Sequence, residues 1–263
     1  MQLEIINKSD SNSKNQPLLF IHGMFHGAWC WEPYFMPYFS DLGYDTYAIS
    51  LRNHAGSESE KLMWRVRIKE YVEDVRQAVE SIGGDPILIG HSMGGFVLQK
   101  YLEKYQAPAV VLLASVPPKG IITTSIRVAK KHPLSFLKTN LTLNFRYIIS
   151  NLEEAKHLLF SKNLPDDETK AYHSKLENEA YLAYFDMLGF DLPKVKQIKA
   201  PKMLVIGAEN DTLISVPETK KTADTYGAKH VVISNIAHDV MLDVNWKDTA
   251  DAIENWLLDK VAP

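Results

Sequence analysis

The sequence predicts an α/β protein with a mostly parallel sheet, helices on both faces of that sheet, and one helical insertion. Along most of the chain, short apolar runs alternate with amphipathic helical patterns, which is typical of parallel β-α-β units. Several of these runs are apolar at consecutive positions, as in strands buried on both faces. In residues 117–195 the strand patterns disappear, and apolar residues recur at helical spacing.

The predicted strands are short apolar segments bounded by polar or turn-forming residues. Residues 18–21 form the clearest of them, because this continuous apolar run stops abruptly at His22-Gly23. The polar residues 9–16 before it are expected to form turns. In chain order, the expected strands are residues 3–7, 18–21, 44–50, 87–89, 109–114, 202–206 and 231–234.

The predicted helices of the α/β part have recognisable faces and ends. Residues 69–82 place their apolar side chains on one face, and Gly83-Gly84 can end that helix. A later helix begins near Val216, where Ser215 and Glu218 have capping-box spacing. Gly227 can end this later helix. Another expected helix follows Ser92 and continues to about Tyr105. The last one contains Trp246, Ala250, Ile253 and Leu257 on one face.

The helical stretch at residues 117–195 is interpreted as an insertion and not as a separate domain, because the α/β pattern resumes after it. The expected division is an α/β core of residues 1–116 and 196–263 with a helical cap of residues 117–195. The apolar residues at helical spacing in the cap are Phe136, Leu137, Leu141, Phe145 and Ile148.

Composition narrows the class of protein. The chain is 46% hydrophobic and 23% charged, and its formal net charge of −3 argues against a nucleic-acid partner. The lone Cys30 excludes an internal disulfide and suits a reducing compartment. The first residues lack signal-peptide features, and no apolar run approaches the roughly 20 residues of a membrane span. We therefore expect a cytoplasmic protein. We expect no cofactor and no metal, because the histidines lack metal-ligand spacing.

The motif Gly90-His91-Ser92-Met93-Gly94 carries the strongest chemical signal. It follows an apolar run and precedes a helical pattern, which is the strand-turn-helix arrangement of a nucleophile elbow. The two glycines suit a bend with no room for a Cβ atom. We therefore predict that Ser92 is a nucleophile.

A serine hydroxyl needs a base, and the base needs an orienting partner. His238 lies in the loop after the last predicted strand, and Asp211 lies in the loop after the preceding one. Both loops leave the carboxyl edge of the sheet, so the chain order Ser92, Asp211, His238 suits a catalytic triad. Glu209 in the same loop is a rival for the acid.

Acyl-transfer chemistry also needs donors for the developing oxyanion. The backbone N–H of Met93, directly after the nucleophile, is one candidate. The backbone N–H of Met24, after the apolar run of residues 18–21, is the other.

Three segments resemble the α/β-hydrolase superfamily. Residues 22–31 (HGMFHGAWCW) are similar to plant methylesterases and hydroxynitrile lyases and to their bacterial relatives. Residues 207–211 (GAEND) resemble the acid loop of the superfamily. The resemblance places the acid at the end of that loop, which favours Asp211 over Glu209. Residues 52–57 (RNHAGS) resemble its Gly-His-Gly-x-Ser loop, with Asn53 and Ala55 where glycines are usual. The resemblance implies the α/β-hydrolase fold, the triad, a two-amide oxyanion hole and a helical cap.

The leading hypothesis is a serine hydrolase that cleaves a small to medium, apolar carboxylic ester through an acyl-enzyme. Phe25, His26, Met187 and Leu213 are the expected residues of the substrate pocket. Two alternatives remain open. One is different chemistry on the same fold, such as a hydroxynitrile lyase or a carbon–carbon bond hydrolase. A plant hydroxynitrile lyase is expected to have a lysine near the catalytic histidine, and residues 235–239 around His238 contain none. The other is a small-molecule receptor with slow turnover.

Overall fold

The computed structural model describes residues 2–9 and 15–261, so residues 10–14 of the expected turn segment lie outside the described part. The described strands form one seven-stranded sheet in the order β1-β3-β2-β4-β5-β6-β7, which is parallel except for β1. The strands are β1 (Ile5–Lys8), β2 (Leu18–Ile21), β3 (Thr46–Ile49), β4 (Ile87–His91), β5 (Ala109–Leu113), β6 (Lys202–Ala208) and β7 (Lys229–Ile233). This arrangement confirms the predicted fold class.

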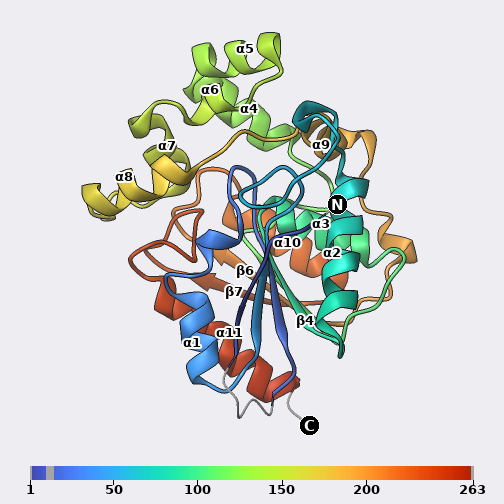
Figure 1. The fold of residues 1–263 in the computed structure, drawn as a ribbon. Helices are drawn as coiled ribbons and strands as arrows, with labels where there is room; N and C mark the ends of the chain where they lie inside the picture. Colours follow the sequence, from blue (N-terminus) through green and yellow to red (C-terminus); the bar gives the residue numbers. More distant parts are fainter. Residues whose placement is uncertain (1, 10–14, 262–263) are drawn as a thin grey trace.

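Helices cover both faces of the sheet (Figure 1). One face carries α1 (Phe35–Asp41) and α11 (Trp246–Lys260), and the other carries α2 (Ile68–Ile82), α3 (Met93–Tyr101) and α10 (Val216–Tyr226). The Tyr34 and Trp246 rings stack at 4.8 Å between centroids, which joins α1 to α11. The predicted capping box of α10 is present, because Glu218 accepts a hydrogen bond from the Ser215 N–H at 2.8 Å.

The chain between β5 and β6 is helical and lies together at one end of the sheet (Figure 1). We call residues 117–195 the helical segment. Its helices are α4 (Ile122–Lys131), α5 (Pro133–Thr142), α6 (Arg146–Ile149), α7 (Leu152–Leu159), α8 (Asp166–Lys175) and α9 (Tyr181–Phe185). A π-helical turn (Asp186–Phe190) follows, and 3₁₀ turns occur at Ala28–Cys30, Met63–Arg65 and Val195–Gln197.

Buried acids join the helical segment to α2. Asp186 accepts hydrogen bonds from the Ile68 N–H and from Arg67 Nε, both at 3.0 Å, so it satisfies the start of α2. Glu179 accepts a 2.7 Å hydrogen bond from the Tyr71 hydroxyl. Each carboxylate lies more than 100 positions after its partner in α2, and the two contacts hold the helical segment in one position above the strands.

The ends of several elements differ from the sequence expectation. The strand β6 continues to Ala208 instead of Ile206, because Ala208 still pairs with Ile233 of β7. The helix α3 ends at Tyr101 instead of Tyr105, and Lys104 N–H already bonds the Tyr101 carbonyl in a tighter turn. Within the described ranges, no helix has both the length and the apolar character needed to cross a membrane.

Candidate active site

Ser92 stands in the turn between β4 and α3, in a backbone conformation that non-glycine residues rarely adopt (φ 51°, ψ −115°). Two neighbours must be glycine for this turn to exist. A Cβ on Gly90 would lie 2.7 Å from the Gly95 nitrogen, and a Cβ on Gly94 would lie 2.5 Å from the Ile21 oxygen. The turn therefore stores strain at the residue predicted to be the nucleophile, as is common at functional sites.

The structure brings Ser92, His238 and Asp211 into one line of hydrogen bonds. His238 Nε2 lies 2.9 Å from Ser92 Oγ, and His238 Nδ1 lies 2.7 Å from Asp211 Oδ2. The other Asp211 oxygen accepts the N–H groups of Leu213 and Ile214 at 2.7 and 2.9 Å. The carboxylate is thus held by its own loop with one oxygen facing the imidazole.

Glu209, the rival acid, lies elsewhere in this loop. Its side chain is exposed and accepts a 2.9 Å hydrogen bond from the Asn235 N–H. It ties the loop after β6 to the loop after β7. The geometry therefore favours Asp211 as the partner of His238.

The surroundings of His238 decide its charge. Burial opposes the charged imidazolium and would lower the pKa of His238. Asp211, by its charge and hydrogen bond, and Asp239, by its charge, outweigh burial and raise this pKa above the ordinary 6.5. His238 is therefore a stronger base than an isolated imidazole.

This shift predicts a pH dependence. Because protonated His238 has no lone pair to accept the serine proton, kcat/KM is expected to fall on the acid side, with a midpoint above pH 6.5. The measurement is a pH profile of kcat/KM with a neutral ester, whose own charge does not change. In an Asp211→Asn variant, the midpoint of the residual activity should move to lower pH. A midpoint below 6.5 in the unmodified protein would contradict this account.

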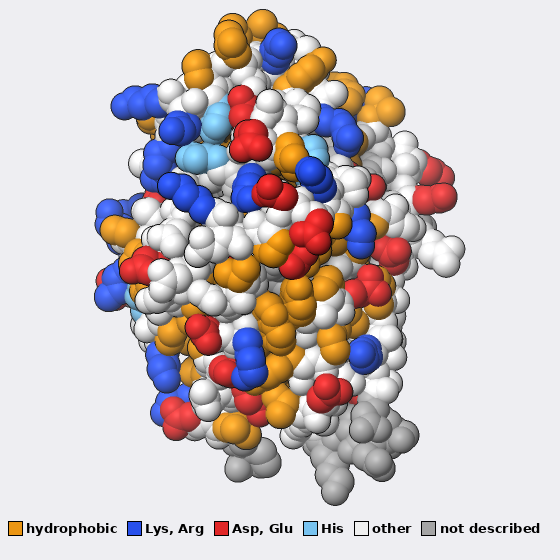
Figure 2. Space-filling view, turned by 90° about the vertical axis from the view of Figure 1, so that its left-hand side faces the viewer, with side chains coloured by type: hydrophobic (Ala, Val, Ile, Leu, Met, Phe, Trp, Pro, Cys, Tyr) orange, Lys and Arg blue, Asp and Glu red, His pale blue; other side chains and the backbone are white. Residues whose placement is uncertain are grey.

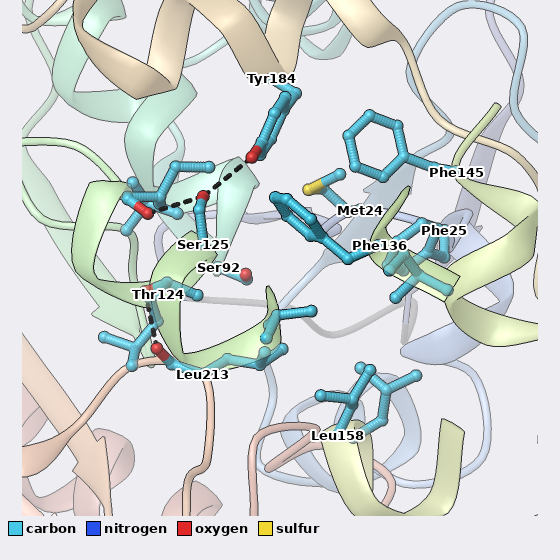
Figure 3. A pocket seen from close by; sticks show the side chains of 16 residues that line it. Met24, Phe25, Ser92, Thr124, Ser125, Phe136, Phe145, Leu158, Tyr184 and Leu213 are labelled. Carbon is cyan, nitrogen blue, oxygen red and sulfur yellow. Dashed lines mark hydrogen bonds between the residues drawn. The ribbon is translucent and has the colours of Figure 1, made fainter. Parts of the chain in front are cut away.

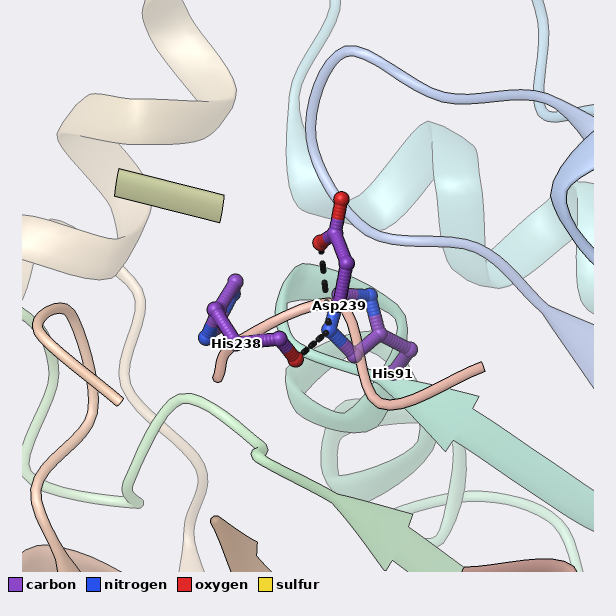
Figure 4. Close-up of side chains that lie close together, drawn as sticks. All are labelled: His91, His238 and Asp239. Atoms are coloured by element: carbon purple, nitrogen blue, oxygen red, sulfur yellow. Dashed lines mark hydrogen bonds and ion pairs between the residues drawn. The ribbon is translucent and has the colours of Figure 1, made fainter. Parts of the chain in front are cut away.

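His91, His238 and Asp239 form a buried cluster beside Ser92 (Figure 4). Their donor atoms lie within 4.8 Å of one another, a spacing that a metal ion could accept. Both ring nitrogens of His238 are already engaged, however, by Ser92 and Asp211. The cluster does not fit a metal without breaking that line of hydrogen bonds.

The cluster instead holds the backbone of His238. His91 Nε2 lies 3.0 Å from the His238 carbonyl oxygen, and His26 Nε2 lies 3.0 Å from Asp239 Oδ2. Burial, then the neighbouring His238, lowers the pKa of His91 to about 3, so His91 is neutral and its Nε2–H donates to that carbonyl. Burial would raise the pKa of Asp239, but His26, His91 and His238 outweigh it and lower that pKa.

A cavity of about 90 Å³ leads to Ser92 (Figure 3). Its wall is almost entirely apolar. Beyond Ser92 itself, its polar side chains are Thr124, Ser125 and Tyr184, and the Tyr184 hydroxyl donates to Ser125 at 2.9 Å. The lining residues are Met24, Phe25, Ser92, Val116, Ile121, Thr124, Ser125, Val128, Phe136, Phe145, Ile148, Leu158, Leu159, Tyr184, Leu213 and Ile214.

Of the four expected pocket residues, Phe25 and Leu213 line this cavity, whereas His26 and Met187 do not. His26 is buried, with Nδ1 2.7 Å from the Met24 carbonyl and Nε2 against Asp239, so it supports the site from behind. Met187 is fully buried, and its carbonyl accepts the Ile121 N–H at 3.0 Å. Most of the wall comes from the helical segment, chiefly from α4 and α7 and from single residues of α5, α6 and α9. Sequence reasoning missed these residues because their apolar pattern does not show which face meets Ser92.

The expected oxyanion donors lie on the two segments that flank Ser92. Met93 is the first residue of α3, and Met24 follows β2 by three positions. Within the described ranges, neither N–H group donates a hydrogen bond to the protein. Gly23 keeps the Met24 segment close, since a Cβ there would be 3.0 Å from Ser92 Cβ. Both amides thus remain available for a ligand oxygen.

The loop at residues 52–57 has positive φ at both positions where the sequence departs from the usual glycines. Asn53 and Ala55, which stand where glycines are usual, both have positive φ (64° and 45°). Asparagine tolerates this conformation, whereas alanine pays about 1 kcal/mol or more for it. A 2.8 Å hydrogen bond from the Ala55 N–H to Glu177 of the helical segment helps to hold the loop in place.

The sheet order, the strained serine turn and the line of hydrogen bonds from Ser92 to Asp211 define an α/β-hydrolase architecture. A profile described as the alpha/beta hydrolase family matches residues 18–252, and the chain belongs to this family.

Curated relatives point to the plant branch that the sequence resembles. The chain is 26% identical to Methylesterase 2 of Arabidopsis thaliana over 48% of this chain and 45% of that protein. It is 30% identical to Salicylic acid-binding protein 2 of Nicotiana tabacum over 41% and 42%, so it spans less than half the length of either relative. An esterase from Exiguobacterium antarcticum has a similar fold, with a TM-score of 0.77, 14% identity, and 97% and 95% of the two chains covered.

Proposed function

We propose that this protein is a serine hydrolase that cleaves a small to medium, apolar carboxylic ester. The observation that carries the proposal is the line of hydrogen bonds from Asp211 through His238 to Ser92, which ends at the wall of an apolar cavity. The name of the relative Methylesterase 2 also supports ester cleavage.

In the proposed reaction, His238 Nε2 takes the proton of Ser92 as Oγ attacks the ester carbonyl. Asp211 holds the imidazole tautomer and stabilises the imidazolium. The Met24 and Met93 amides bind the oxyanion, and His238 returns its proton to the leaving alcohol. A water molecule, deprotonated by His238, then attacks the acyl-enzyme and releases the carboxylic acid and free Ser92.

The helical segment acts in this proposal as a cap over an α/β core of residues 1–116 and 196–263. Its α4, α5 and α7 side chains surround the apolar part of the substrate, and the Tyr184–Ser125 pair adds a polar point. Within the described residues, no lysine lines the cavity, whereas the resemblance associates a lysine with hydroxynitrile lyases. Ester cleavage is therefore favoured over lyase chemistry. The cytoplasmic location stays a prediction.

The test combines active-site labelling with a substrate panel. A fluorophosphonate probe is expected to label Ser92, since the probe requires an activated serine. Among nitrophenyl esters of increasing acyl length, kcat/KM should rise with apolar area until the cavity is full and then fall. A charged acyl group should lower kcat/KM by roughly tenfold or more, because none of the described residues that line the cavity has a charged side chain to pair with it. A folded protein that neither takes the label nor cleaves any ester would overturn the proposal.

A further inference from the structure

Helices α4 and α5 have apolar side chains on two opposite sides. Val128 and Phe136 line the cavity that leads to Ser92, and Figure 3 shows the Phe136 ring pointing into it. Other apolar side chains of the same helices are exposed to solvent. We call these residues the outer apolar face: Ile122, Ile126, Leu134, Leu137 and Leu141. Figure 2 shows hydrophobic side chains at the top of the molecule, over the end that carries these helices.

The outer apolar face is ordered by helical spacing. Ile122 and Ile126 are four residues apart on α4, and Leu134, Leu137 and Leu141 form a stripe on α5. Leu134 and Leu141 are each 75% exposed, so nothing in the described chain covers them. Single exposed leucines are ordinary, but two adjacent stripes on consecutive helices form a patch that indicates an interaction site.

The charge around this face differs from the charge of the whole chain. Residues 117–150 contain six lysines and arginines and no acid, although the protein has a net charge of −3. Arg127 is paired with Glu218 of α10. Lys130, Lys131 and Lys138 are exposed and, within the described ranges, form no ion pair. Leucines flanked by free lysines on a helix surface are typical of segments that lie on anionic lipid.

We propose that the outer apolar face seats on an anionic lipid–water interface, with the leucines among the acyl chains and the lysines at the headgroups. The proposal rests on the proposed function in one respect only: the cavity then takes its ester from that interface. Because the inner sides of α4 and α5 line the cavity, an apolar ester that leaves the lipid passes these helices to reach Ser92.

A second copy of this chain is a poorer occupant of the same face. A symmetric dimer through this face would bring Lys130, Lys131 and Lys138 of both copies together. The acids that contact α4 and α5 are Glu154 and Glu218, and they are already engaged by His132 and Arg127. The repulsion would oppose the gain from apolar burial. An anionic lipid surface offers acyl chains that bury the leucines and negative headgroups that attract the lysines.

The binding test uses flotation with vesicles and needs no catalysis. The Ser92→Ala protein is expected to float with phosphatidylcholine vesicles that contain phosphatidylglycerol, more weakly with phosphatidylcholine alone, and less as salt rises. Leu134→Ser or Leu141→Ser should each weaken binding about fivefold. Leu258→Ser is the matched control and should have no effect. Leu258 is 60% exposed, and its helix α11 lies away from α4 and α5, on the far side of the sheet (Figure 1).

Charge substitutions give an independent check. Lys130→Gln and Lys138→Gln should each weaken binding to the anionic vesicles about fivefold. Lys69→Gln, at an exposed lysine of α2, should leave it unchanged. No binding to anionic vesicles, or equal losses in the Leu258 and Leu134 variants, would overturn the proposal. Two other outcomes would also overturn it. One is a concentration-dependent dimer that Leu134→Ser abolishes while vesicle binding persists, and the other is nucleic-acid binding that behaves in the same way.

Activity separates this proposal from the proposed function. Leu134→Ser and Leu141→Ser should lower turnover of a long-chain ester carried in anionic vesicles, while turnover of a short, dispersed ester stays unchanged. If the protein floats with vesicles but cleaves no ester, the lipid surface stands and the hydrolase proposal fails. If it cleaves esters but never floats, the hydrolase proposal stands and the lipid surface fails.

Discussion

A Ser92→Ala variant is expected to lose roughly 10⁴-fold or more in kcat/KM for an ester that fits the cavity. The substitution removes Ser92 Oγ, which is the hydrogen-bond partner of His238 Nε2 and the proposed nucleophile. The amides of Met24 and Met93 and the cavity would remain, so weak residual turnover and ester binding should persist. The measurement is steady-state hydrolysis of a nitrophenyl ester beside the unmodified protein.

Folding provides the control for this variant. Among the described residues the Ser92 hydroxyl bonds only His238, and the turn depends on Gly90 and Gly94, so the melting temperature should change little. Alanine should also abolish fluorophosphonate labelling. Undiminished hydrolysis by a folded Ser92→Ala protein would mean that another group performs the chemistry.

An Asp211→Asn variant is expected to lose about 10⁴-fold in kcat with little change in fold. The loop N–H groups of Leu213 and Ile214 already donate to one side of this side chain, so an asparagine would place its oxygen there. Its NH₂ group would then face His238 Nδ1 and donate to it. That reverses the tautomer, puts the proton on Nε2, and removes the acceptor for the Ser92 proton.

Glu209→Gln is the matched control, because it changes an acid of the same loop by the same chemistry. Glu209 accepts a hydrogen bond from Asn235 and has no contact with His238, so kcat should stay within about threefold of the unmodified value. Equal losses in the Asp211 and Glu209 variants would indicate a general effect of the loop instead of an imidazole tautomer.

Local sequence patterns were sufficient for the fold and for the core of the candidate site. The run at residues 18–21 and the Ser215–Glu218 capping box depend on neighbours a few positions apart, and both appear as expected. The serine turn is also local, since Gly90 and Gly94 lie within two residues of Ser92. His238 and Asp211 could be placed near Ser92 because parallel strands end at the same edge of a sheet.

The walls of the site could not be derived in this way. His26 was expected in the pocket, yet its Nε2 lies 3.0 Å from Oδ2 of Asp239, more than 200 residues later, and the ring is buried in the interior. Asp211 is distinguished from Glu209 by the directions in which two side chains of one loop point. The apolar face of α5 that meets the cavity and the face that meets solvent have similar composition, as Phe136 and Leu137 illustrate.

By itself, the sequence determined the approximate positions of the strands and of most helices of the α/β part. It also determined where the strained serine turn lies and which histidine and which acid-containing loop follow the last two strands. These features depend on hydrogen bonds and steric limits within a few residues. Only the tertiary structure decided which acid faces His238, which apolar side chains enclose the cavity, and which stay exposed to solvent. Those outcomes depend on packing between segments far apart in the chain. A pattern of residue types does not tell which distant segment a given side chain will face.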